Sequence, residues 1–379
     1  MAGTVASVTG TAASIGVVLT ALTGLGATPD QTATAVFLML ISYGLLSIGL
    51  SWRFKMPISI VWSTPGAALL VSSASLGLGF ANATGAFLVT GALLALTGLW
   101  PALGRVVSAI PKPIASAMLA GVIFPFCIAP FQAISEYSKI VLPALLVWLV
   151  LYRFAQVWAA PVAIAVAFIG IWFQLGVSVP QAQILPVFEV ITPQFNPVAI
   201  IGIAIPLYLV TMASQNVPGI AIMKTFGYEV PFRPVLVSTG ITTMAQSFFG
   251  GFALNLAAIT AALNANEQAH KDSTKRWMAS VFGGVLYLVL AFAVTPLVAF
   301  VNEVPRVLVL ATAGVALFGT MVNAVFSTVE VAELRLPAIV TFLIGASGLA
   351  LFGVGPAFWA LLGGVLIWQW LELTKSRRT

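Results

Sequence analysis

Long stretches of this chain contain no charged residue, and they limit its fold more than any other feature. They include residues 56–104, 234–266 and 336–371. A helix that spans a bilayer needs roughly 20 mostly apolar residues, so the first stretch is long enough for two crossings. Over the whole chain 60% of the residues are hydrophobic and 7% are charged, whereas soluble domains carry about 25% charged residues. The sequence therefore predicts an all-α polytopic membrane protein in a lipid bilayer.

The apolar runs between charges and Gly or Pro breakers give about fourteen crossings. With both termini in the cytoplasm, this count leaves Lys139 and Arg306 as the only basic residues outside, which is the bias of the positive-inside rule. The net charge of +6 is then explained by cytoplasmic loops, and we expect no nucleic-acid partner. The predicted spans lie near residues 2–26, 31–52, 57–80, 82–103, 112–134, 138–154, 157–176, 196–222, 232–248, 250–269, 277–301, 304–323, 336–353 and 355–372.

The third and the tenth predicted spans are interrupted. The third contains WSTPGAALL at 62–70, and the tenth contains GFALNLAAIT at 251–260. Pro65 suits the first turn of a helix. Ser63 or Thr64 is suited to cap that helix, and Asn255 is suited to cap a second one. Both stretches predict helices that begin in mid-membrane, with unpaired N–H groups and partial positive charge at their starts.

The two interruptions indicate an internal repeat. Seven crossings per half give the halves opposite orientations, so we expect residues 1–192 and 193–379 to form two inverted repeats. Alignment of the Ala67-Ala68 pair with Ala257-Ala258 matches the two breaks. Broken helices at corresponding places in two such halves point to the binding site of a secondary transporter.

Neutral polar side chains gather near the breaks and in the eighth predicted span. A Ser-Gln-Asn triplet before Pro218, deep in an apolar span, is unfavourable unless it has a function. Helix N-termini and neutral donors suit a small anion with an apolar body. The expected substrate-binding residues are Thr11, Ser14, Ser63, Thr64, Pro65, Gly66, Ser214, Gln215, Asn216, Phe252, Asn255 and Leu256, with Ile60 and Trp62 as further apolar contacts.

A purely structural explanation exists for several of these residues. Serine and threonine in membrane helices usually bond to their own backbone or to a neighbouring helix, which would account for Thr11 and Ser14. Trp62 would then serve packing alone. Gln215 and Asn216 are harder to explain in this way, because two amides in one apolar span need partners.

Three segments resemble the benzoate/proton symporter family. They are the run from Ser51 through MPISIVWSTPGAALL, the segment YLVTMASQNVPGIAIMKTFGY at 208–228 and the run SFFGGFALNLAAITAALNANEQAHKD at 247–272. The resemblance covers essentially the whole chain. It implies import of benzoate or a similar aromatic carboxylate together with protons, in a bacterial inner membrane, and it allows a homodimer.

The resemblance also implies the seven-plus-seven inverted-repeat fold of the nucleobase transporters. In that fold the first to fourth and eighth to eleventh spans form a core domain that carries the substrate. The fifth to seventh and twelfth to fourteenth spans form a gate domain. The third and tenth spans are each a short strand followed by a half-helix.

The absence of acidic residues near the predicted site favours an anion. Nucleobase transporters of similar fold usually place carboxylates on the eighth and tenth spans, where this chain has Ser214, Gln215 and Asn255. This absence leaves the proton carrier open: either the substrate itself carries or shares the proton, or Glu330 or Glu333 lies deeper than its sequence position suggests.

Other functional classes fit the sequence less well. With one cysteine, Cys127, and one histidine, His270, we expect no intrachain disulfide, no metal site and no cofactor. The chain has no HExxH motif and no paired intramembrane aspartates, which argues against an intramembrane enzyme. A channel would more often have repeated rings of polar residues along one pore. A nucleobase or inorganic-anion transporter of the same fold remains the alternative.

Overall fold

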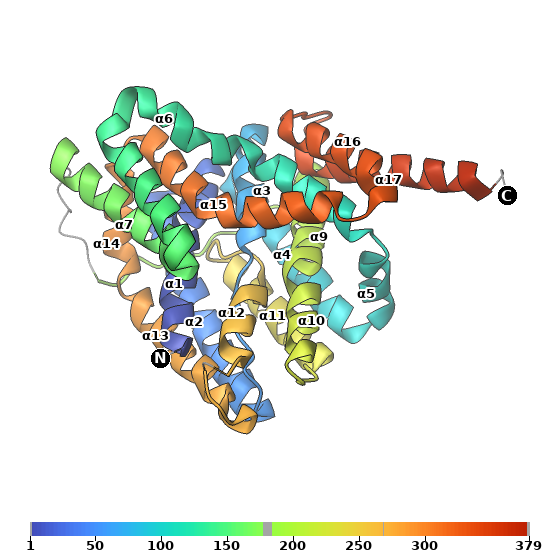
Figure 1. Cartoon of the computed structure of the whole chain (residues 1–379), viewed down its shortest axis with the longest axis horizontal. Helices are drawn as coiled ribbons and strands as arrows, with labels where there is room; N and C mark the ends of the chain where they lie inside the picture. Colours follow the sequence, from blue (N-terminus) through green and yellow to red (C-terminus); the bar gives the residue numbers. More distant parts are fainter. Residues whose placement is uncertain (1, 177–183, 268, 377–379) are drawn as a thin grey trace.

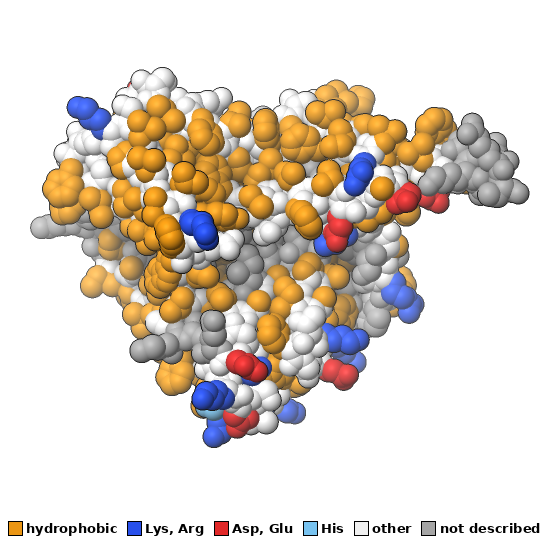
Figure 2. Space-filling view, viewed as in Figure 1, with side chains coloured by type: hydrophobic (Ala, Val, Ile, Leu, Met, Phe, Trp, Pro, Cys, Tyr) orange, Lys and Arg blue, Asp and Glu red, His pale blue; other side chains and the backbone are white. Residues whose placement is uncertain are grey.

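The computed structural model describes residues 2–176, 184–267 and 269–376, which are mostly helical (Figure 1). Hydrophobic side chains cover much of the surface in Figure 2, and charged side chains gather toward its lower end and lower right edge. Phe154 and Phe173 are among the large apolar side chains that are mostly exposed. An apolar outer surface of this extent fits a protein that is surrounded by lipid.

The first half of the chain contains seven α-helices and one short strand in its described part. Most of these elements begin and end within a few residues of the predicted spans. They are α1 (Ala2–Gly24), α2 (Pro29–Phe54), β1 (Ile60–Trp62), α3 (Thr64–Ser73), the 3₁₀ turn η1 (Ala74–Leu76), α4 (Phe80–Leu99), α5 (Pro101–Ser108), α6 (Lys112–Phe154) and α7 (Gln156–Leu175).

The second half follows a similar order, with a strand between helices near its start. Its eighth predicted span consists of short α-helical pieces separated by two π-helical segments, η2 and η3. The elements are α8 (Pro197–Ala199), η2 (Ile200–Ala204), α9 (Ile205–Thr211), η3 (Met212–Asn216), α10 (Val217–Thr225), α11 (Phe232–Ser247), β2 (Leu254–Leu256), α12 (Ala258–Ala265), η4 (Ser273–Lys275), α13 (Trp277–Ala291), α14 (Val294–Asn302), α15 (Arg306–Val329), η5 (Ala332–Leu334), α16 (Arg335–Ala346) and α17 (Pro356–Ser376).

The number of membrane crossings stays a prediction. Among the described residues, eight helices are long and apolar enough to span a bilayer, or nine if the bent pair α13–α14 counts as one span. Helix α6 has 43 residues and covers two of the predicted spans, with a non-helical kink at Tyr137 (φ −124°, ψ 40°). The half-helices α3 and α12 are each too short to span a bilayer alone. Each strand with its half-helix lies within the range of the predicted interrupted span.

Strands β1 and β2 pair with each other in the interior of the protein. The pairing is antiparallel, with Val61 opposite Asn255. Two further backbone bonds extend it, from Ser63 N–H to Ala253 O (3.0 Å) and from Ala257 N–H to Ser59 O (2.9 Å). Because the strands run in opposite directions, α3 and α12 leave the small sheet in opposite directions.

The start of α3 agrees with the prediction, and the start of α12 does not. Ser63 is the N-cap of α3, its hydroxyl oxygen accepts the Gly66 N–H (3.1 Å), and Pro65 lies in the first turn. Asn255 was expected to cap the second half-helix, but it lies at the centre of β2, and α12 begins after Ala257. The prediction failed because pairing with β1 extends the strand past Asn255.

The same pairing corrects the repeat alignment. Val61 pairs with Asn255, and the half-helices begin at Thr64 and Ala258, an offset of 194 residues in both cases. The match of Ala67-Ala68 with Ala257-Ala258 implied an offset of 190. The offset between the two strand-and-helix units thus differs by four residues from the sequence alignment, and the inverted repeat of the whole halves stays a prediction.

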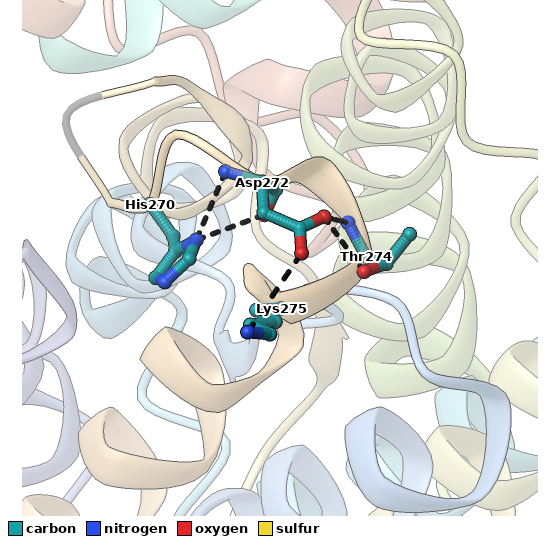
Figure 3. Close-up of polar contacts among 4 residues, drawn as sticks. All are labelled: His270, Asp272, Thr274 and Lys275. Atoms are coloured by element: carbon teal, nitrogen blue, oxygen red, sulfur yellow. Dashed lines mark hydrogen bonds and ion pairs between the residues drawn. The ribbon is translucent and has the colours of Figure 1, made fainter.

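The loop after α12 is held by polar contacts (Figure 3). The Arg276 guanidinium is buried and donates to Ala265 O (2.7 Å) at the end of α12. The Asp272 carboxylate accepts hydrogen bonds from the Thr274 hydroxyl (2.7 Å) and N–H (2.9 Å). These two bonds lower the pKa of Asp272 from its ordinary value. The loop thus covers the end of α12, where Ala265 is buried, and the other end of this half-helix lies at the sheet.

Candidate functional site

A cavity of about 380 Å³ lies beside the paired strands. One part of its wall comes from α1, α2, β1 and η3 and from the first turns of α3 and α12. The opposite part comes from α6, α7 and α15. Its volume lies within the roughly 300–1,000 Å³ that is usual for small-molecule sites. Both half-helices contribute at their starts, through Thr64 of α3 and through Ala257 and Thr260 at α12.

The polar lining of the cavity is neutral. Among the predicted site residues, Thr11, Ser14, Thr64 and Gln215 reach it. None of the described residues that line it is Asp, Glu, Lys, Arg or His. The cavity can therefore offer hydroxyl and amide hydrogen bonds and the positive ends of two helix dipoles, but no formal charge.

Aromatic side chains form one wall. The ring of Tyr43 packs edge-to-face against Trp62 (centroids 5.5 Å apart) and against Tyr287 (4.4 Å). The Trp62 indole N–H donates to Ser14 Oγ (2.9 Å), and the Ser14 hydroxyl donates to Gly10 O (2.7 Å). These bonds fix the orientation of the indole, which leaves a preorganised apolar wall beside the polar groups.

A second aromatic pair lies on α6. The rings of Trp148 and Tyr152 stack with centroids 4.9 Å apart and also line the cavity. Aromatic contacts therefore come from both parts of the wall, so a planar ring bound here has neighbours of matching shape.

Other predicted site residues lie behind the wall and support it. Ser63 is buried, and besides capping α3 it accepts a hydrogen bond from the Thr211 hydroxyl (3.0 Å). Asn216 is also buried, and its Oδ1 accepts the Leu256 N–H of β2 (2.9 Å). The remaining buried residues that do not line the cavity are Ile60, Pro65, Gly66, Phe252 and Leu256.

Asn255 is one of several buried residues with unused hydrogen-bonding groups. Its side chain is fully buried, and neither its amide nitrogen nor its oxygen has a partner among the described residues. Directly paired residues of an antiparallel sheet point to the same face, and its partner Val61 lines the cavity. An unpartnered buried amide costs about 1–3 kcal/mol, so Asn255 is a group that a ligand or a water on the cavity side would satisfy.

Three predicted residues lie away from the cavity. Ser214 is partly buried in η3 and does not line it. Glu330 is exposed and forms an ion pair with Lys112 (3.4 Å). Glu333 is exposed in η5. The two glutamates thus have no contact with the neutral lining in this conformation.

Sequence reasoning missed the tyrosines. Tyr43 and Tyr287 come from α2 and α13, which carry no break and no polar cluster. A tyrosine in the middle of an apolar span was the available signal, because its hydroxyl needs a partner away from water. Thr260 was missed as well, since the misplaced start of α12 put it outside the expected first turn.

Comparison with known proteins places the chain among membrane transporters. The family model of benzoate membrane transport proteins (BenE) matches residues 1–369. The inner membrane protein YdcO of Escherichia coli K12 is 34% identical over 378 residues, which cover 100% of this chain and 96% of that protein. The benzoate membrane transport protein of Acinetobacter baylyi is 30% identical over 342 residues, 89% of this chain and 85% of that one.

Solved structures with the same fold include anion transporters. The transmembrane domain of the cyanobacterial bicarbonate transporter BicA superposes with a TM-score of 0.59 at 16% identity, covering 96% of this chain and 97% of that one. The murine anion transporter Slc26a9 in its inward-facing state superposes with a TM-score of 0.58 at 13% identity, covering 99% and 68%. At these identities the likeness concerns the fold alone.

Substitution of the neighbouring residues Gln215 and Asn216 tests which of them supports the fold and which only lines the cavity. We expect Asn216→Ala to lower the free energy of unfolding by about 1–3 kcal/mol, because the buried Leu256 N–H loses its acceptor. Gln215→Ala removes only a long contact to the Ala258 N–H (3.4 Å) and should change stability little. Thermal unfolding of both purified variants in detergent measures the difference. Equal melting temperatures would contradict the supporting role of Asn216.

Proposed function

Since the chain belongs to the benzoate membrane transport protein family, we propose that it imports benzoate or a similar aromatic carboxylate together with protons. The observation that carries this proposal is the neutral, aromatic-walled cavity beside the two half-helix starts. The name of the Acinetobacter baylyi relative agrees with such a substrate. The proposed function is secondary transport, in which the substrate is not chemically converted.

The carboxylate end of the substrate should bind at the half-helix starts. Thr64 and Gln215 line the cavity there, and hydroxyl and amide donors bind a carboxylate without a fixed cation. The ring should lie against Trp62 and Tyr43, whose orientations are fixed by the contact to Ser14 and by edge-to-face packing. Asn255 lies beside Val61 in the sheet without lining the cavity, and it would be a further donor if the strand shifts.

The neutral lining also supports proton coupling through the substrate. Removal of a carboxylate from water disfavours its charged form and raises its pKa. Hydrogen bonds to the charged form and helix N-termini oppose this rise, and a nearby cation opposes it as well. No cation lines the described cavity. A carboxylate that enters this site is therefore favoured to take up a proton, and the pair crosses as a neutral acid without an acidic side chain as carrier.

The membrane arrangement that fits this function has fourteen crossings and cytoplasmic termini. In it α6 supplies two crossings, and each strand with its half-helix supplies one. The cavity then lies between a core domain, which includes α1, α3, α12 and α13, and a gate domain, which includes α6, α7 and α15. Rocking of one domain against the other would expose the cavity to each side in turn, in the inner membrane of a bacterium.

Ligand binding tests the substrate class. We expect benzoate to raise the melting temperature of the purified protein in a concentration-dependent way, and uracil and bicarbonate to leave it unchanged, because the site pairs an aromatic wall with neutral donors. Thr64→Val should weaken benzoate binding about tenfold through loss of one hydrogen bond. Thr225→Val is the matched control, since Thr225 is exposed at the end of α10. Stabilisation by uracil but not by benzoate would refute the proposal.

Proton flux tests the coupling. If the substrate carries the proton, its bound pKa is raised above its free value, so the apparent affinity improves as the pH falls, by up to about tenfold per pH unit. Uptake into proteoliposomes should move one proton with each benzoate in wild type, Glu330→Gln and Glu333→Gln alike. Loss of coupling in either glutamate variant, with uptake retained, would assign the proton to that side chain instead.

A further inference from the structure

A second cavity, of about 280 Å³, lies farther along the same pair of helices. It is lined by the last turns of α1, including Thr20 and Thr23, and by the first turn of α15 with the residues before it, including Asn302 and Arg306. The first cavity uses α1 only as far as Ser14, and it uses α15 from Ala316 onward. The two cavities therefore lie one after the other between α1 and α15.

A short contact of small residues separates the two cavities. Between them a side chain added at Gly16 of α1 would meet the backbone of Ala313 and the hydroxyl of Thr312 on α15, both at 3.9 Å. From Ser14 to Leu19 the separating segment of α1 is about 8 Å long at 1.5 Å per residue. The α1–α15 contact at Gly16 is therefore what lies between the two cavities.

The chemistry of the second cavity differs from that of the first. The hydroxyls of Thr20 and Thr23 donate to their own helix, at Gly16 O and Leu19 O (2.8 Å each). Arg306 is exposed and has no ion pair or hydrogen bond within the described part of the chain. Its guanidinium and the Asn302 amide are thus the groups able to donate to a ligand there.

We propose that this second cavity is an outer collecting site for the carboxylate anion, with Arg306 as its binding residue. The inference rests on the proposed function. A guanidinium offers two parallel N–H donors that match the two oxygens of a carboxylate. The predicted topology leaves Arg306 and Lys139 as the only basic residues outside, and Lys139 does not line this cavity. Arg306 concentrates the anion outside, and the neutral cavity behind the α1–α15 contact receives it.

Uptake kinetics test this site by comparing removal of the Arg306 charge with removal of another exposed positive charge. We expect Arg306→Gln to raise the KM for benzoate about fivefold at low ionic strength with an unchanged maximal rate, since a lost charge pair weakens capture. The difference should shrink at high salt, because exposed charges are screened. Lys139→Gln, which removes an exposed positive charge elsewhere, should behave as wild type, and Arg306→Lys should keep most of the affinity.

Each outcome has one meaning. Wild type that takes up no benzoate would overturn the proposed function itself. If wild type takes up benzoate normally and the KM of Arg306→Gln equals that of Lys139→Gln, the collecting site alone would be overturned.

Thiol modification gives a second readout that does not depend on a loss of function. In Arg306→Cys the only other cysteine is Cys127, which is buried. Benzoate should slow the reaction of the new thiol with membrane-impermeant methanethiosulfonates added to intact cells. A cationic reagent should lower the KM toward the wild-type value, and an anionic one should raise it. Equal effects of both reagents, or no protection by benzoate in a variant that transports it, would refute the site.

Discussion

A helix that is broken inside a membrane leaves backbone groups which water cannot satisfy, and the rest of this structure depends on how those groups are paired. The inner edges of β1 and β2 bond to each other. Their outer edges bond to side chains of three neighbouring segments: Ser47 of α2 at Ile60 N–H (2.8 Å), Thr243 of α11 at Leu254 N–H (3.1 Å) and Asn216 of η3 at Leu256 N–H (2.9 Å). The break therefore fixes the positions of three helical segments around one small sheet.

This pairing divides the polar residues near the break between those that support the backbone and those that line the cavity. Ser63 and Asn216 hold the backbone, so their hydrogen bonds are already used. Thr64 and Gln215, which directly follow and precede them in sequence, line the cavity. Alternation of this kind places hydrogen-bonded backbone directly beneath the groups that line the cavity, as a binding site of fixed geometry would require. The proposed proton uptake by the substrate rests on the neutrality of this lining.

Local chemistry in the sequence was sufficient to predict the start of α3, because Ser63 and Pro65 are themselves the cap and the first turn. It was not sufficient for α12, whose start depends on a register with a strand almost two hundred residues away. The charge-free stretches likewise predicted the helical membrane fold. The aromatic wall was predicted only in part. Trp62 was expected as an apolar contact, but its packing with Tyr43 and Tyr287 depends on how α2, β1 and α13 come together.

Photoaffinity labelling with an azidobenzoate tests most directly whether the cavity beside the paired strands holds the substrate. Labelled peptides, identified by mass spectrometry, should come from the lining segments β1–α3, η3 and the start of α12, and excess benzoate should prevent their labelling. Labelling confined to exposed surface side chains such as Phe173, or labelling of the lining that benzoate does not reduce, would contradict the account.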